Sequence, residues 1–184
     1  GPISLEMATA FRDLGSEVAL VELLDRVIST EDPLVSSTIE AALRGRGVEV
    51  FTGTSIERFS GNTAHLGDGR TIADVDRVLL AVGRRPKLAD LGLDVAGIDY
   101  TERGITADTF GRTNVDGIYA VGDVTGNTLT THGANSIGRR AIRAIALPYL
   151  PKLGMPRALP NAVFCRPEIA SVGMTVDEVD ALPQ

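Results

Sequence analysis

The chain has 184 residues, of which 43% are hydrophobic and 23% are charged, and this composition excludes a collagen, a disordered chain and a disulfide scaffold. The length predicts one domain or two small ones. The 24 acidic residues outnumber the 18 basic ones, which gives a net charge of −6. We therefore expect no nucleic-acid-binding surface, because phosphate binding needs clustered lysine and arginine.

Neither a targeting segment nor a membrane span is expected. No apolar run reaches the roughly 18 residues that a membrane span needs, and no basic and apolar leader opens the sequence. The one cysteine, Cys165, cannot form an internal disulfide and gives no sign of an oxidising compartment. We expect a cytoplasmic protein in which Cys165 is a small buried residue.

Strands alternate with amphipathic helices along the first fifty residues. Apolar residues recur at helical spacing in two stretches, and a short apolar run of the buried-strand type follows each stretch. The helices are expected at residues 3–14 and 33–46, and the strands at residues 17–22 and 48–51. This alternation predicts a parallel α/β sheet.

Residues 55–72 have a different pattern of short alternating segments, with the turn pair Asp68-Gly69 before the last one. They predict a small antiparallel meander inserted in the α/β domain. The near-continuous apolar run at residues 77–82 then predicts another buried strand.

The second half of the sequence carries weaker signals. Residues 87–104 are rich in loop residues, and an apolar run at residues 118–121 predicts one more buried strand. A helix is expected at residues 132–147, followed by a linker that Pro148, Pro151, Pro156 and Pro160 mark, and by strands at residues 162–164 and 169–172.

The first 22 residues fit the second half of a dinucleotide fingerprint, which has a strand, G-x-G-x-x-G, a helix and an acid about 20 residues on. Gly1 would be the second glycine, Ser4 the small residue in place of the third, and Glu22 the acid that binds the ribose of NAD. Half a fingerprint fits equally an ordinary helix after a Gly-Pro protease scar, with Glu22 as a surface residue.

Asp123 directly follows Gly122 at the expected carboxyl end of the strand at residues 118–121, where α/β sheets bind ligands. A carboxylate there accepts hydrogen bonds from a polyol, and the positive end of the next helix would face the same place. The alternative is that Asp123 only caps a helix.

Four blocks of the sequence resemble the FAD-dependent pyridine nucleotide–disulfide oxidoreductases, the family of dihydrolipoamide dehydrogenase, glutathione reductase and mercuric reductase. The blocks are residues 1–8 with Val21-Glu22, residues 80–86, residues 112–123 and residues 164–173. They occur in the family's order and span almost the whole sequence.

The resemblance implies an NAD site near the start of the chain. Gly1, Ile3 and Ser4 match the backbone that meets the NAD pyrophosphate. Glu22 matches the acid on the adenosine ribose, which favours NADH over NADPH. Glu6 matches an acid near the nicotinamide and the flavin, which in the family pairs with a lysine outside this sequence.

The resemblance also implies an FAD site. Asp123, after Gly122, matches the aspartate that holds the FAD ribityl chain, and Gly83 matches a glycine beside the nicotinamide nucleotide. The stretch whose backbone would face the flavin pyrimidine consists of Leu129, Thr130, Thr131 and His132. The helix N-terminus would stabilise negative charge on the flavin there.

The expected fold is α/β, with a three-layer Rossmann-like parallel sheet and a small antiparallel meander. The resemblance implies an NAD-binding domain at residues 1–85 without its first strand, a segment of the FAD-binding domain at residues 86–158, and the start of an interface domain at residues 159–184. The family's first FAD fingerprint, redox cysteine pair and C-terminal His–Glu pair are not in this sequence. We therefore assign no catalytic residue and no metal ligand, and expect the 184 residues alone to be inactive.

The expected function is that of part of a flavoprotein oxidoreductase, which passes a hydride from NAD(P)H to FAD and on to a disulfide, quinone or metal-ion acceptor. The implied cofactors are FAD and NAD, and the implied partners are a small-molecule acceptor and a second copy in a homodimer. The alternatives are a non-enzymatic dinucleotide-binding module and an inactive fragment.

Overall fold

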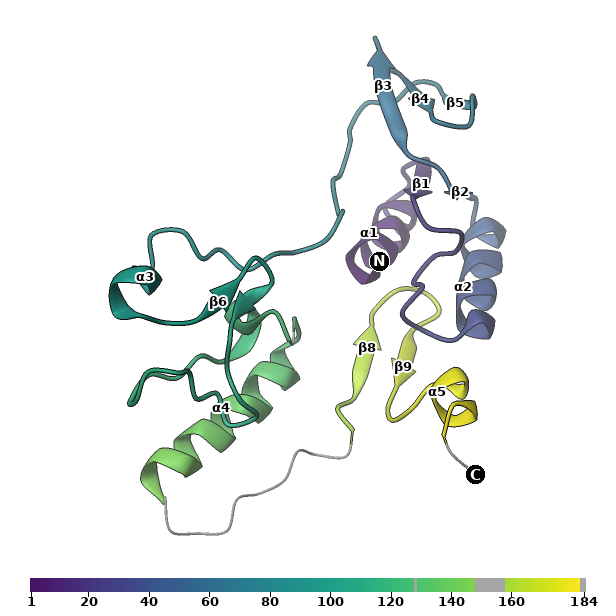
Figure 1. The fold of residues 1–184 in the computed structure, drawn as a ribbon. Helices are drawn as coiled ribbons and strands as arrows, with labels where there is room; N and C mark the ends of the chain where they lie inside the picture. The colour runs from purple at the N-terminus through teal and green to yellow at the C-terminus, as the bar shows by residue number, and fades with distance from the viewer. Residues whose placement is uncertain (128, 148–157, 183–184) are drawn as a thin grey trace. The chain divides into compact units, whose positions relative to one another are not determined.

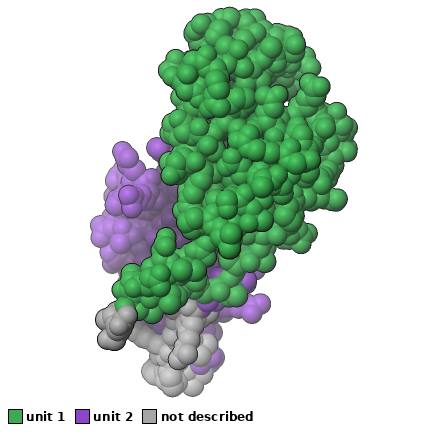
Figure 2. All heavy atoms as spheres, turned by 90° about the vertical axis from the view of Figure 1, so that its right-hand side faces the viewer, with its two compact units in different colours: residues 1–82, 161–184 green, residues 83–160 purple. Residues whose placement is uncertain are grey.

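The computed structural model describes residues 1–127, 129–147 and 158–182, and the chain divides into two compact units (Figure 2). Unit 1 comprises residues 1–82 and 161–184, and unit 2 comprises residues 83–160. Unit 1 is therefore discontinuous in sequence, because the residues of unit 2 lie between its two stretches. Within the described ranges, no helix is both long and apolar enough to cross a membrane.

Unit 1 opens with the predicted alternation of helices and strands (Figure 1). These elements are α1 (Pro2–Asp13), β1 (Val18–Glu22), α2 (Pro33–Gly45) and β2 (Val48–Thr52). β1 and β2 pair in parallel, with Val18 opposite Val48 and Glu22 opposite Thr52. Pro33 is the first residue of α2, a position whose N–H has no partner within a helix in any case.

The predicted meander is also present. It consists of β3 (Ile56–Ser60), β4 (Thr63–Leu66) and β5 (Thr71–Ile72), which form an antiparallel sheet in that order. In the turn between β4 and β5, the carboxylate of Asp68 accepts a hydrogen bond from the backbone N of Arg70 at 3.0 Å. Hydrogen bonds from the Arg70 side chain and backbone lower the pKa of the Asp68 carboxyl. The mixed α/β fold, with parallel and antiparallel sheets, is confirmed.

Two predicted strands are wrong. Residues 77–82 form no strand, and Leu80 and Val82 expose 78% and 90% of their surface. Residues 118–121 hold only an isolated bridge, from Tyr119 to Arg112. A run of apolar residues becomes a strand only where a neighbouring strand accepts its hydrogen bonds. In the part of the chain that the structure describes, no strand pairs with either run.

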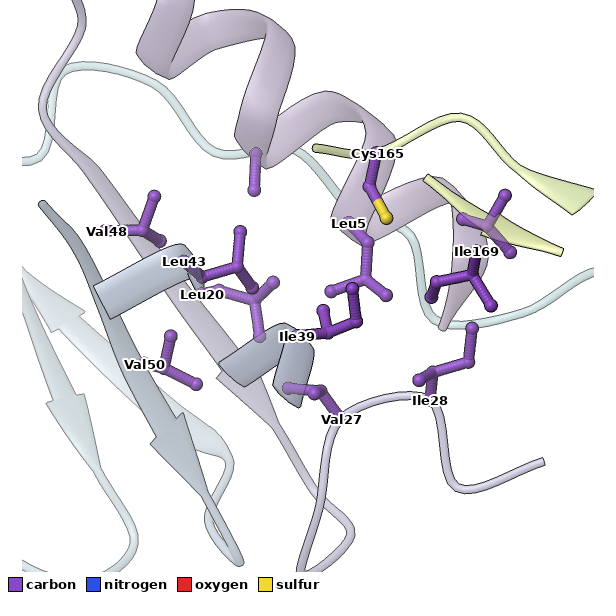
Figure 3. Packing of buried hydrophobic residues seen from close by; sticks show 12 residues of the cluster. Leu5, Leu20, Val27, Ile28, Ile39, Leu43, Val48, Val50, Cys165 and Ile169 are labelled. Carbon is purple, nitrogen blue, oxygen red and sulfur yellow. The ribbon is translucent and has the colours of Figure 1, made fainter. Parts of the chain in front are cut away.

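The core of unit 1 draws on both of its sequence stretches (Figure 3). The returning stretch contains β8 (Asn161–Val163), β9 (Ile169–Ser171) and α5 (Val176–Asp180). Val163, Cys165 and Ile169 are 0%, 1% and 6% exposed, and they belong to the same apolar cluster as Leu5 and Ile28. The expectation that Cys165 is buried is confirmed, and burial raises the pKa of its thiol.

Polar contacts fix the returning stretch in the same place. The buried carboxylate of Glu31 accepts hydrogen bonds from Asn161 Nδ2 at 2.8 Å and from Ser171 Oγ at 3.3 Å. The backbone N of Val176 donates to Asp32 at 3.2 Å. Residues 161–182 therefore pack against the first stretch of unit 1, and their assignment to an interface domain of a longer protein stays a prediction.

Unit 2 has a smaller core, around Leu93, Ile105 and Ala120. Its elements are α3 (Leu93–Ala96), β6 (Tyr100–Thr101), β7 (Gly104–Ile105), the short 3₁₀ helix η1 (Gly122–Thr125) and α4 (Thr131–Ala146). The helix predicted at residues 132–147 is confirmed as α4, whereas α3, β6 and β7 lie where a loop was expected. The predicted linker falls mostly on residues 148–157, outside the described residues.

Candidate cofactor sites

The first candidate site lies in unit 1, where the start of α1 meets the end of β1. Parallel pairing with β2 holds β1, so its last residue, Glu22, has a fixed place. Glu22 Oε2 accepts a hydrogen bond from Gly1 N at 3.2 Å, and Oε1 accepts one from Leu24 N at 3.2 Å. Glu22 thus lies beside the start of α1, 21 positions from Gly1, and its predicted role at the ribose of NAD stays a prediction.

The beginning of α1 has the features of an anion-binding helix end. The first helical hydrogen bond runs from Leu5 N to Gly1 O, at 3.3 Å. The N–H groups of Ile3 and Ser4 lie ahead of it, in the turn where a helix has no internal partners. Ser4 Oγ lies 3.5 Å from Gly1 N. These N–H groups and the positive end of the helix dipole suit a phosphate.

Glu6 does not join this group of residues. It lies one turn further along α1, and its Oε1 accepts a hydrogen bond from the backbone N of Phe164 at 2.9 Å. This contact ties α1 to the residue after β8, 158 positions further along the chain. The predicted role of Glu6 near the nicotinamide stays a prediction.

The second candidate site lies in unit 2, where η1 meets α4. Gly122 begins η1 with φ +77°, a conformation that residues with a Cβ rarely adopt. A Cβ on Gly122 would also lie 3.2 Å from that of Ala134, so glycine permits the close approach of η1 to α4. Asp123 follows, and its carboxylate forms an ion pair with Arg84.

The start of α4 lies in the same unit and is exposed. Thr130 caps the helix, and its Oγ1 accepts a hydrogen bond from Gly133 N at 3.3 Å. The predicted flavin-facing residues are all exposed, and they are Leu129, Thr130, Thr131 and His132. The first turn of this 16-residue helix carries no acidic residue, so its positive end is not neutralised by its own side chains.

Arg84 is the residue that sequence reasoning missed. Besides its ion pair with Asp123, its Nη1 donates to the carbonyl of Leu129 at 3.4 Å. It directly follows Gly83, whose φ of +110° fits only glycine readily. The sequence does contain a signal for Arg84, because it belongs to the block at residues 80–86 that resembles the family. The resemblance assigns a role in that block only to Gly83.

Between them, the two sites offer helix N-termini and carboxylates, which suit phosphates and polyols. Among the residues that the structure describes, no group of three or more His, Cys, Asp or Glu could hold a metal ion.

Comparison with known families agrees with this arrangement. Residues 1–143 match the family described as pyridine nucleotide-disulphide oxidoreductase, and the chain belongs to this family. It is 37% identical to the dihydrolipoyl dehydrogenase of Corynebacterium glutamicum, in an alignment that covers 97% of this chain and 40% of that protein. The dihydrolipoyl dehydrogenase of Chlamydia pneumoniae is 34% identical, with 98% of this chain and 39% of that protein covered.

Solved structures show the same relationship. The Cu(II) complex of the HOCl-induced flavoprotein disulfide reductase RclA from Escherichia coli aligns with a TM-score of 0.87 and 29% identity, over 100% of this chain and 43% of that one. LpdA from Mycobacterium tuberculosis aligns with a TM-score of 0.84 and 30% identity, over 98% of this chain and 40% of that one. The chain therefore spans about 40% of the length of the relatives it matches.

Proposed function

We propose that this chain supplies nucleotide-binding parts of a flavoprotein oxidoreductase that passes a hydride from NAD(P)H to FAD and on to a disulfide, quinone or metal-ion acceptor. Family membership supports the reaction class. The observation that carries the cofactor assignment is the position of Asp123, whose carboxylate is 39% exposed on η1, in the same unit as the start of α4.

The residues present fit FAD. The Asp123 carboxylate can accept a hydrogen bond from a ribityl hydroxyl, and Gly122 lets η1 lie close to α4. The exposed first turn of α4 can donate N–H groups to the flavin pyrimidine, and the positive end of the helix favours electron density there. FAD, when bound, supplies the hydride acceptor, and these residues hold and orient it.

The residues at the start of α1 fit NAD in the same way. The N–H groups of Ile3 and Ser4 face the pyrophosphate, and Glu22 accepts the hydroxyls of the adenosine ribose. NADH is then preferred over NADPH, because Glu22 would repel a 2′-phosphate. In this proposal Glu6 lies near the nicotinamide end of the nucleotide.

The intact protein in this proposal is a cytoplasmic homodimer. Its NAD-binding domain covers residues 1–85, a segment of the FAD-binding domain covers residues 86–158, and an interface domain starts at residue 159. Its catalytic groups lie outside the 184 residues, so that this stretch binds cofactors and does not act alone.

The test uses the full-length protein that the gene encodes, purified and saturated with FAD. We expect the absorbance of bound flavin, and bleaching of that absorbance when NADH is added without oxygen. If the protein bound FAD and NADH but the flavin absorbance did not bleach, the protein would be a non-enzymatic dinucleotide-binding module. A protein that retains no flavin and whose FAD affinity is undetectable would contradict the proposal.

A further inference from the structure

Arg84 joins two parts of unit 2 that the flavin site needs in a fixed relation. One amino group of its guanidinium, Nη2, pairs with Asp123 Oδ2 on η1, 39 positions away. The other, Nη1, donates to the carbonyl oxygen of Leu129, 45 positions away and just before the cap of α4. A single planar side chain thus links the carboxylate to the entrance of the helix.

From this geometry we propose that Arg84 is a positioning residue of the FAD site. It holds Asp123 Oδ2 and thereby presents Oδ1 to a ribityl hydroxyl, while it holds the chain before α4 in place. The inference rests on the proposed function, because it assigns Arg84 a role at the FAD site proposed above.

The exposure of the pair leaves room for a ligand. The Asp123 and Arg84 side chains are 39% and 55% exposed, so a hydroxyl can approach the carboxylate. A carboxylate has about four acceptor positions on its two oxygens, and an arginine at Oδ2 leaves those on Oδ1. The ion pair therefore orients the acceptor without filling it.

Arginine suits this role better than lysine. Its guanidinium is planar and presents several N–H groups at fixed angles, so it can reach Asp123 and Leu129 together. A lysine carries its charge on one nitrogen at the end of a flexible stem, so it can keep the ion pair with Asp123 but does not hold both partners in a fixed geometry. Lysine at position 84 should therefore retain part of the contribution that Arg84 makes to FAD binding.

The experiment measures FAD affinity of the full-length protein, from which bound FAD has been removed, by titration of flavin fluorescence. R84A should weaken FAD binding by about tenfold, which corresponds to about 1.4 kcal/mol, and R84K by about threefold, because lysine keeps only the ion pair with Asp123. Arg85 is exposed and adjacent, so R85A is the matched control and should change affinity less than twofold.

A double-mutant cycle with Asp123 separates positioning from a general structural role. If Arg84 acts through Asp123, R84A should have little further effect on FAD affinity in a D123A background. NADH affinity, which depends on Gly1, Ser4 and Glu22 of unit 1 in the proposed function, should stay unchanged in every variant and reports that unit 1 is folded. An unchanged circular dichroism spectrum and melting temperature report that unit 2, which carries the substitutions, is folded as well.

Two results would overturn the inference while the proposed function stands. One is an R84A effect that persists undiminished in the D123A background, which would make Arg84 independent of Asp123. The other is tighter FAD binding by R84A, which would mean that Arg84 competes with the ribityl chain. Failure of the unmodified protein to bind FAD at all would instead overturn the proposed function, and this inference with it.

Discussion

Two carboxylates mark the two candidate sites, and the structure holds them in different ways. Glu22 ends a paired strand and is 19% exposed, and it accepts hydrogen bonds from Leu24 N and from the amino group of Gly1, with which it forms an ion pair. Asp123 follows a run that forms no strand, is 39% exposed and pairs with the side chain of Arg84. Main-chain nitrogens 2 and 21 positions away hold the first carboxylate, whereas the second depends on a side chain 39 positions away.

The largest effect is expected from Asp123→Ala in the full-length protein. Loss of the charged acceptor should weaken FAD binding by about ten- to a hundredfold, because such a hydrogen bond contributes roughly 1.5–3 kcal/mol. Flavin titration measures the change. Asp116, an exposed aspartate in the preceding turn, provides the control, and its alanine variant should bind FAD normally. A lower melting temperature with unchanged FAD affinity would reduce Asp123 to a structural cap.

Gly122→Ala tests whether the backbone beneath Asp123 matters as much as the carboxylate. With φ at +77° and the Ala134 Cβ at 3.2 Å, the added methyl group should cost about 1–2 kcal/mol of stability. Urea unfolding of the chain measures this loss. Gly138, inside α4 with open space around it, is the matched control, and Gly138→Ala should leave stability equal or slightly higher. If both substitutions changed the free energy of unfolding equally, the backbone at Gly122 would not be strained by an added methyl group.

Glu22→Ala examines the other carboxylate. Removal of its negative charge should narrow the preference for NADH over NADPH by about tenfold, which corresponds to roughly 1.4 kcal/mol. The ratio of the two kcat/KM values in the full-length protein measures the preference. Glu49, exposed on β2, serves as the control. If the native protein uses both coenzymes equally, Glu22 does not select between them.

Ser4→Ala should give the smallest effect. Its Oγ lies 3.5 Å from Gly1 N, at the limit of hydrogen-bond distance. We therefore expect a change in stability below about 0.5 kcal/mol and nearly unchanged NADH affinity, because the proposed contact uses the backbone of Ser4. A large loss of NADH affinity in this variant would show that the hydroxyl itself binds the nucleotide.

The parts of the fold that local signals define could be predicted from the sequence. Helical spacing with a proline or glycine at one end located α1 and α2, and the Asp68-Gly69 pair located the meander turn. The place of Glu22 at the end of β1 could be predicted for a similar reason, because the short apolar run before it defines the strand.

The remaining features depend on contacts that sequence patterns do not contain. The run at residues 77–82 is as apolar as β1, but no described strand pairs with it. The partners of Asp123 and Glu6 lie 39 and 158 positions away, and neither pairing follows a repeating pattern. α3, β6 and β7 have only four or two residues each, too few to show a period.

The discontinuity of unit 1 has a consequence for the order of events during synthesis. Val163, Cys165 and Ile169 complete a core whose other members lie within the first fifty residues, and the contacts of Glu31 with this stretch span 130 and 140 positions. A ribosome must translate all of unit 2 before that core can close. Contacts of such long range slow folding, because the loop between them must be ordered first. Until then, the first helices and strands of a nascent chain expose the apolar side chains of this core to solvent. Exposed apolar surface of this kind is what chaperones bind and where aggregation begins.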